Sequence, residues 1–272
     1  MKILFSHFGL EGKGGWGRTF LLAAGLAKLG NEVMLMTVQP NSFKFPYIKK
    51  HISNVTVISF PEIIPNSLSN RGFGLLSLII KLVFVCFNRA DIVDADCGHR
   101  PGCGWPCLLH RLIYNSIYIS EWWDYFGSGG QLENKPKIFK AFLGKYESYA
   151  EIADKKTANG VVVLSDSLRQ RAIAHGVKTN HLIKIHGGAN IKDIHYLPDS
   201  TVLKEKMGIP ISNLVFGYIG MGDSEIDDLL PFIKAFTELV NVMDISWVCF
   251  GSKLSHLSKE KLKLQNEFYE FG

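Results

Sequence analysis

Apolar and polar positions alternate along the chain in a repeated order, in which a short apolar run precedes a longer stripe with helical spacing. The first run, Ile3 to Phe5, is followed by a glycine-rich loop and by a helical stripe that ends at Gly30. A second apolar run, Val33 to Val38, comes next. The order strand, helix, strand predicts two parallel strands joined by a right-handed crossover.

The same pattern continues downstream. It predicts strands over 55–60, 90–96, 118–120, 161–165, 182–185, 214–220 and 245–250. It predicts helices over 75–87, 136–157, 167–175, 226–240 and 254–271, the second with Ile138, Phe142, Tyr146 and Tyr149 at helical spacing. Glycine and proline predict a loop over 97–106, and a second, aromatic and acidic loop is expected over 121–127. Alternating strands and helices predict an α/β fold of doubly wound parallel sheets.

A break in the pattern at Pro198, Asp199 and Ser200 separates two regions, and strand and helix signals begin afresh after it. We therefore expect a Rossmann-like domain over 1–196 and a second one over 197–272. The second region has only about 75 residues, fewer than the roughly 100 to 200 of a typical domain, so we expect it to be truncated.

The glycine-rich loop predicts a ligand site. Without a Cβ atom, Gly14 and Gly15 can adopt positive φ and allow a phosphate or sugar to approach the main chain. The spacing of Gly12, Gly14, Gly15 and Gly17 is not the G-x-G-x-x-G dinucleotide motif, and no Lys-Ser or Lys-Thr pair follows as in a P-loop. The loop therefore favours a phosphate-bearing ligand over NAD, and the alternative is a turn that serves chain geometry only.

Composition narrows the class of protein. The chain has 272 residues, of which 47% are hydrophobic and 20% charged, so it can bury a substantial core. A net charge of +5 suits phosphorylated ligands or an anionic membrane surface, but no dense Lys/Arg run indicates nucleic acid. The first strand begins directly after Met1, which leaves no room for a secretory signal and favours the cytoplasm.

Two further segments leave alternatives open. The apolar segment from Gly72 to Phe87 is too short to span a membrane, which leaves a core helix, the favoured interpretation, or an interfacial helix on the inner face of the membrane. The five cysteines are expected to be reduced thiols. Several Cys and His residues lie between Cys97 and His110, but no C-x-x-C pair occurs, so we predict no metal site.

Several short motifs occur in a characteristic order. They are Gly14-Gly15, Leu26-Ala27 with Gly30-Asn31-Glu32-Val33, Val161 to Ser165 with Leu168, Ile185 to Asn190 with Pro198, and Phe216 to Gly222. In this order and spacing the chain resembles the retaining, nucleotide-sugar-dependent glycosyltransferases of the GT-B fold, similar to family four. The resemblance covers nearly the whole chain and implies two Rossmann-like domains that face a cleft.

The resemblance implies roles for particular residues. The donor sugar nucleotide would contact Gly14, Gly15, Gly220, Gly222 and Lys253. The acceptor side would include Asp96 and Arg100, with His99 as the catalytic candidate. His186, Gly187, Gly188 and Asn190 would lie at the interdomain cleft. No metal or cofactor is implied beyond the donor substrate.

Glu121, Trp122 and Asp124 fit a sugar site chemically, because carboxylates accept hydrogen bonds from hydroxyls and an aromatic face packs on a pyranose. The alternative for these three residues is a capped turn with core aromatics.

The chain also departs from the family. Relatives carry an arginine and a lysine after the Gly220 loop to neutralise the leaving diphosphate, whereas Asp223, Ser224 and Glu225 follow here. The family's pair of donor-binding glutamates is absent as well, and we expect it beyond Gly272. We predict transfer of a sugar, with retention, to a glycan or lipid-linked acceptor in cell-surface polysaccharide synthesis. The alternative is a non-catalytic ligand- or membrane-binding fragment, and a dinucleotide-dependent oxidoreductase is disfavoured because the fingerprint is missing.

Overall fold

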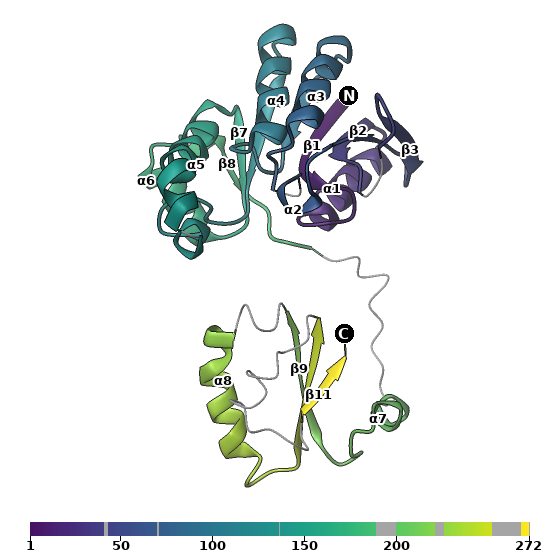
Figure 1. Ribbon diagram of the computed structural model, residues 1–272, viewed down its shortest axis with the longest axis vertical. Helices are drawn as coiled ribbons and strands as arrows, with labels where there is room; N and C mark the ends of the chain where they lie inside the picture. Colours follow the sequence, from purple (N-terminus) through teal and green to yellow (C-terminus); the bar gives the residue numbers. More distant parts are fainter. Residues whose placement is uncertain are drawn as a thin grey trace. The chain divides into compact units, whose positions relative to one another are not determined.

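A computed structural model describes residues 1–40, 43–69, 71–135, 137–188, 200–220, 226–251 and 268–271. The chain forms two compact units, Met1–Ala189 and Asn190–Gly272 (Figure 1). The predicted domain boundary at 196/197 lies outside the described residues.

Unit 1 is built on an eight-stranded sheet in the order β3-β4-β2-β1-β5-β6-β7-β8. The strands are β1 (Lys2–Leu10), β2 (Glu32–Val38), β3 (Ile48–Ile52), β4 (Val55–Phe60), β5 (Ile92–Ala95), β6 (Ile117–Trp122), β7 (Gly160–Val163) and β8 (Leu182–Lys184). All neighbours pair in parallel except β3 with β4. The predicted α/β fold with a parallel sheet is confirmed.

The helices of unit 1 cover this sheet (Figure 1). They are α1 (Trp16–Lys28), α2 (Asn66–Ser69), α3 (Leu75–Phe87), α4 (Pro101–Tyr114), α5 (Lys137–Thr157) and α6 (Asp166–Ala174), with short 3₁₀ turns at Gln131–Asn134 and Thr179–His181. Alternate residues of β1 face opposite layers: Ile3 and Phe5 pack with Ala23 and other residues of α1, whereas Leu4 belongs to the larger core with Phe84 of α3.

The strand order places a topological switch point between β1 and β5. The chain runs from β1 outward to β2 and β4, then returns to β5 on the other side of β1. Ile3 of β1 consequently pairs with both Val33 of β2 and Ile92 of β5. In open α/β sheets, the crevice beyond the carboxyl ends of strands at such a point is the usual ligand site.

The predicted loop over 97–106 is wrong in its second half, where α4 begins. Pro101 occupies the first turn, a position that suits its fixed φ and missing N–H. Gly104 lies within the helix, and the position requires glycine because a Cβ there would lie 1.7 Å from the carbonyl oxygen of Gly98. The glycines that suggested a loop therefore permit close packing of a helix.

Helix α5 is confirmed, but its apolar stripe does not face the core. Ile138, Phe142 and Tyr149 are exposed, while the buried face carries Glu147, Glu151, Asp154 and Lys155. Lys155 illustrates how this charge is accommodated, since its Nζ donates to Ser120 Oγ at 2.6 Å and to Asp154 Oδ2 at 2.8 Å. The inner side of α5 is thus a polar surface that meets β6.

Helix α3 has one buried apolar face and one exposed apolar face. Its inner face is buried through Leu78, Phe84 and Val85, which confirms a core contact. Its outer face exposes Leu75, Ile79, Val83 and Phe87. No helix in the described part of the chain is long and apolar enough to cross a membrane. Buried Lys81 donates to the carbonyl oxygens of His7 and Gly102, which joins the end of β1 to the start of α4.

Unit 2 contains a three-stranded parallel sheet in the order β11-β10-β9. Its elements are α7 (Thr201–Met207), β9 (Leu214–Gly220), α8 (Ile226–Leu239), β10 (Ile245–Gly251) and β11 (Phe268–Phe271). A small core joins α8 to β10 through Ile233, Phe236, Ile245 and Trp247. The predicted helix over 254–271 is wrong over 268–271, which form β11, and its remainder lies outside the described residues.

Candidate functional site

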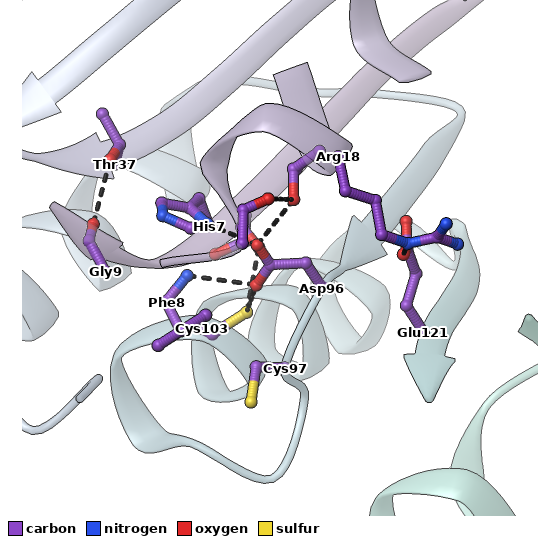
Figure 2. A network of polar contacts seen from close by, with 12 residues as sticks. His7, Phe8, Gly9, Arg18, Thr37, Asp96, Cys97, Cys103 and Glu121 are labelled. Atoms are coloured by element: carbon purple, nitrogen blue, oxygen red, sulfur yellow. Dashed lines mark hydrogen bonds and ion pairs between the residues drawn. The ribbon is translucent and has the colours of Figure 1, made fainter. Parts of the chain in front are cut away.

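The candidate site lies at the carboxyl ends of β1 and β5 in unit 1. Asp96 directly follows β5, and its carboxylate is buried in a network of polar contacts (Figure 2). Asp96 Oδ1 accepts hydrogen bonds from the Phe8 N–H at 3.1 Å and from Cys103 Sγ at 3.4 Å. Asp96 Oδ2 accepts from the Thr19 hydroxyl at 2.8 Å and contacts Nδ1 of His7.

This network positions the glycine loop. Burial alone would raise the pKa of Asp96, but the charge and hydrogen bond of His7, with the Thr19 and Cys103 hydrogen bonds, hold that pKa below its usual value. The other ring nitrogen of His7 lies 3.2 Å from the carbonyl oxygen of Lys13, and Thr19 lies in the first turns of α1. Both oxygens of Asp96 are engaged within the chain, so the carboxylate positions the glycine loop, and an acceptor contact by Asp96 stays a prediction.

The glycine loop presents backbone to the crevice. Gly14 has φ of +59°, in the left-handed region that favours glycine, and Gly15 is the N-cap of α1 with no side-chain cap. A Cβ at Gly15 would lie 3.2 Å from a ring carbon of Trp123. The N–H groups in the first turn of a helix have no intrahelical partner, so the start of α1 can receive an anion.

Two carboxylates of the sheet, Asp94 and Glu121, lie near an arginine of α1, Arg18. Arg18 Nε donates to Glu121 Oε2 at 2.7 Å. Burial raises the pKa of Glu121, and Arg18 partly opposes that shift. Burial also raises the pKa of Asp94 well above its usual value, with the charges of Glu121 and Asp96 adding to the effect. Arg18 is thus a cation in the first turn of α1, and its ion pair with Glu121 holds the side chain in place.

The two adjacent tryptophans have different environments. Trp122 ends β6, is fully buried and donates its indole N–H to Glu151 at 2.8 Å, which is the environment that the alternative of a core aromatic expects. Trp123 is partly exposed and packs near Phe8, with ring centroids 6.0 Å apart, while its indole N–H contacts the carbonyl oxygen of Asp96. Asp124 accepts from the Tyr125 N–H at 2.8 Å and contacts Gln131, which makes it a turn residue.

His99 and Arg100 share a carboxylate from α5. His99 Nε2 lies 3.3 Å from Glu147 Oε1, and Arg100 Nη2 lies 2.7 Å from the same oxygen. Burial lowers the pKa of His99, although its hydrogen bond to Glu147 opposes the shift. The imidazole is enclosed against the ring of Phe126 at 4.6 Å between centroids. The catalytic candidate His99 is therefore a buried side chain that shares Glu147 with Arg100 and lines a second pocket of about 220 Å³ with Tyr146.

A pocket of about 190 Å³ opens beside these residues. It is lined by Phe8, Arg71, Cys97, Arg100, Trp123, Phe126, Gln131, Lys135 and Phe139. Trp123 belongs both to this pocket and to the packing around Gly15. The pocket thus adjoins the glycine loop through a shared aromatic wall.

The remaining predicted residues lie elsewhere or outside the described part of the chain. Gly220 ends β9 in unit 2, where a Cβ at Gly251 would lie 2.2 Å from its carbonyl oxygen. His186, Gly187 and Gly188 follow β8 and are exposed. Gly222, Lys253 and Asn190 lie outside the described residues. Donor and cleft roles for this set stay predictions.

Sequence reasoning missed several residues of the site: His7, Arg18, Thr19, Trp123 and Glu147. Strand alternation could have separated the tryptophans, since Tyr118, Ser120 and Trp122 share one face of β6 and are all buried. His7 and Thr19 carried the weaker signal of polar residues flanking a glycine loop. Within the described residues, no group of three or more His, Cys, Asp or Glu side chains could hold a metal ion.

No protein-family model and no curated protein sequence matches this chain. Solved structures match it over its whole length or nearly so. Sucrose-phosphate synthase from Thermosynechococcus elongatus is 14% identical with a TM-score of 0.69, and the match covers 100% of this chain and 70% of that one. Anabaena HepE in complex with UDP-glucose is 16% identical with a TM-score of 0.63, over 100% of this chain and 69% of that one.

WaaG, a glycosyltransferase involved in lipopolysaccharide biosynthesis, is 11% identical with a TM-score of 0.68. That match covers 99% of this chain and 69% of that one. Likeness at such low identity shows the fold, and the fold is that of the GT-B glycosyltransferases, as the resemblance implied.

Proposed function

We propose that this protein is a glycosyltransferase that moves a sugar from a nucleoside diphosphate sugar to a glycan or lipid-linked acceptor with retention of configuration. One observation carries the proposal: in a chain with the GT-B fold, the uncapped start of α1 and the Gly14-Gly15 turn lie at the switch point of the first sheet. The HepE complex supports a UDP-sugar as the donor class.

The residues of unit 1 suggest how the reaction would be assisted. Backbone N–H groups at the start of α1 would stabilise negative charge on the donor diphosphate or the transferred sugar. Arg18 would add a cation nearby, held in place by Glu121. In the retaining reaction an oxygen of the leaving phosphate would take the acceptor proton on the same face, so no enzymic nucleophile and no cofactor is required. Cell-surface polysaccharide synthesis is the process we propose for this activity.

A donor panel tests this function. The protein is incubated with labelled UDP-, GDP- and ADP-sugars, and binding and transfer to glycan and lipid-linked acceptors are measured. Gly15→Val should abolish transfer because the side chain would meet Trp123, whereas Gly25→Ala in the same helix should not, since a Cβ there meets nothing within 4 Å. Failure to bind any of the sugar nucleotides would refute the proposal.

The exposed apolar face of α3 favours a second candidate, a non-catalytic protein of this fold that binds a ligand at a membrane surface. Leu75, Ile79, Val83 and Phe87 lie one turn apart along this face. The wild type should then sediment with phosphatidylglycerol vesicles and Val83→Asp should not, with Val202→Asp on exposed α7 as the control. Vesicle binding without transfer would favour this candidate, and binding together with transfer would indicate a transferase that works at the membrane.

A further inference from the structure

The pocket beside Trp123 has an excess of positive charge. Arg71, Arg100 and Lys135 line it, and no carboxylate does. Only Arg100 has an ion pair among the described residues, with Glu147 at 2.7 Å. Glu147 also lies 3.3 Å from His99, and neither Arg71 nor Lys135 forms an ion pair within the described residues.

The pKa of Lys135 reflects this excess of positive charge. Burial lowers the pKa of Lys135, and the charges of Arg71 and Arg100 lower it further, with Glu147 opposing them. Three cations around one small space repel one another unless an anion enters. The charges that line the pocket therefore favour binding of an anion.

The aromatic side chains that line the pocket indicate which chemical group adjoins the anion in the ligand. Trp123 and Phe126 meet edge to face with centroids 5.3 Å apart, and Phe8 and Phe139 complete an aromatic lining. Arg100 lies over the ring of Phe73 at 4.9 Å, which fixes its guanidinium in the wall. Such a lining accepts the apolar faces of a sugar or an isoprenoid next to a charged group.

We propose that this pocket binds the phosphoryl group of a phosphorylated acceptor, whose adjoining sugar or lipid packs on Trp123. A dianionic phosphate matches the two cations that lack a described partner, and the arginine forks suit its oxygens. Because Trp123 also packs on Gly15, an acceptor held here extends towards the loop where the donor is expected. The role of this ligand as an acceptor rests on the proposed transferase function, whereas the binding of a phosphate in the pocket does not.

The experiment measures binding to the full chain by calorimetry. The probes are glucose 6-phosphate, glucose, a short polyprenyl phosphate in detergent micelles, the matching polyprenol, and UDP. We expect at least one phosphate to bind and its dephosphorylated partner not to bind. Arg71→Gln with Lys135→Gln should weaken that phosphate about tenfold or more, while UDP binding is unchanged. Lys137→Gln, an exposed lysine outside the pocket, is the matched control and should have no effect.

Each outcome has a definite meaning. Binding of glucose 6-phosphate identifies a soluble sugar phosphate, and binding of polyprenyl phosphate alone identifies a lipid-linked acceptor. The proposal is overturned if neither phosphate binds, or if the double variant binds phosphate as tightly as the Lys137→Gln control. Phosphate binding without any UDP or sugar-nucleotide binding would support the phosphate site and refute the transferase function. Binding of UDP or a sugar nucleotide without binding of either phosphate would refute the phosphate site and leave the transferase function standing.

Discussion

Two adjacent side chains, Trp122 and Trp123, show how strictly position along a strand determines role. Trp122 is the last residue of β6; its ring is buried in the core and its indole N–H donates to Glu151. Trp123 is the first residue after the strand and lines the pocket. A one-residue step along a strand moves a side chain to the opposite face of the sheet.

Replacing each tryptophan with alanine should therefore give different results. Trp122→Ala should lower the free energy of unfolding by about 3 to 5 kcal/mol, because it leaves a cavity and removes a partner of Glu151. Trp123→Ala should cost less stability and should weaken phosphate binding in the pocket. Urea unfolding and calorimetry measure the two effects, and equal losses of stability would contradict the assignment.

Asp94 offers a second prediction at this scale, based on pH. Its pKa is raised well above the unfolded value, chiefly by burial, and Oδ1 has no hydrogen-bond partner within the described residues. A raised pKa contributes stability below the unfolded pKa, and this contribution is lost as the pH rises through the folded pKa.

Asp94→Asn should therefore stabilise the protein more at pH 8 than at pH 5, as measured by urea unfolding at each pH. Asp244→Asn, at an exposed position in unit 2, should show no such difference. A gain for Asp94→Asn that is equal at both pH values would contradict an ionisation effect.

The sequence identified the glycine turn and Asp96 because both follow predicted strands of a parallel sheet, where ligand sites are expected. It could not assign their contacts. Asp96 meets His7 and Thr19, which lie 89 and 77 residues away, and no local pattern specifies such pairs. These distant contacts, rather than the residue type, determine that Asp96 positions the glycine loop.

At the scale of elements, strands and the first helix were predictable because their apolar periodicity is strong. Helix α4 was missed because its start carries two glycines and two prolines that local propensity assigns to a loop, while the close packing of Gly104 against Gly98 requires a glycine there. Helix α5 was predicted from the helical spacing of its apolar residues, but that spacing did not reveal which face is buried. The loop after β6 offers N–H groups that need acceptors, and the charged face of α5 is the buried one.

Glu151 tests that explanation. Its carboxylate accepts from the Trp122 indole at 2.8 Å and from the Phe126 and Gly127 N–H groups at 2.9 Å each. Glu151→Ala should lower the free energy of unfolding by about 2 to 4 kcal/mol, because three buried donors lose their acceptor. Glu133→Ala, an exposed carboxylate on the same loop, should change it little by the same urea measurement. A small effect at both positions would mean that α5 does not hold this loop.

At the scale of the whole molecule, the two units have separate cores of unequal size. The core of unit 1 spans an eight-stranded sheet, whereas the described residues of unit 2 form a buried cluster of Ile233, Phe236, Ile245 and Trp247 between α8 and β10. Because the apolar area removed from water determines most of the stability, unit 2 should open more readily than unit 1.

Hydrogen exchange followed by mass spectrometry resolves the two units in the intact chain. Amides of β9 and β10 should exchange faster than those of β1 and β5, and Phe236→Ala should accelerate β9 and β10 further while leaving β1 and β5 unchanged. The reciprocal variant, Val93→Ala in the core of unit 1, should accelerate β1 and β5. If Phe236→Ala accelerated exchange in all four strands equally, the chain would unfold as one cooperative body. The resemblance implies a donor contact by Gly220 at the end of β9, so UDP-glucose should slow exchange in β9 and β10 of the wild type, because a ligand that binds only the folded form stabilises the unit that holds it.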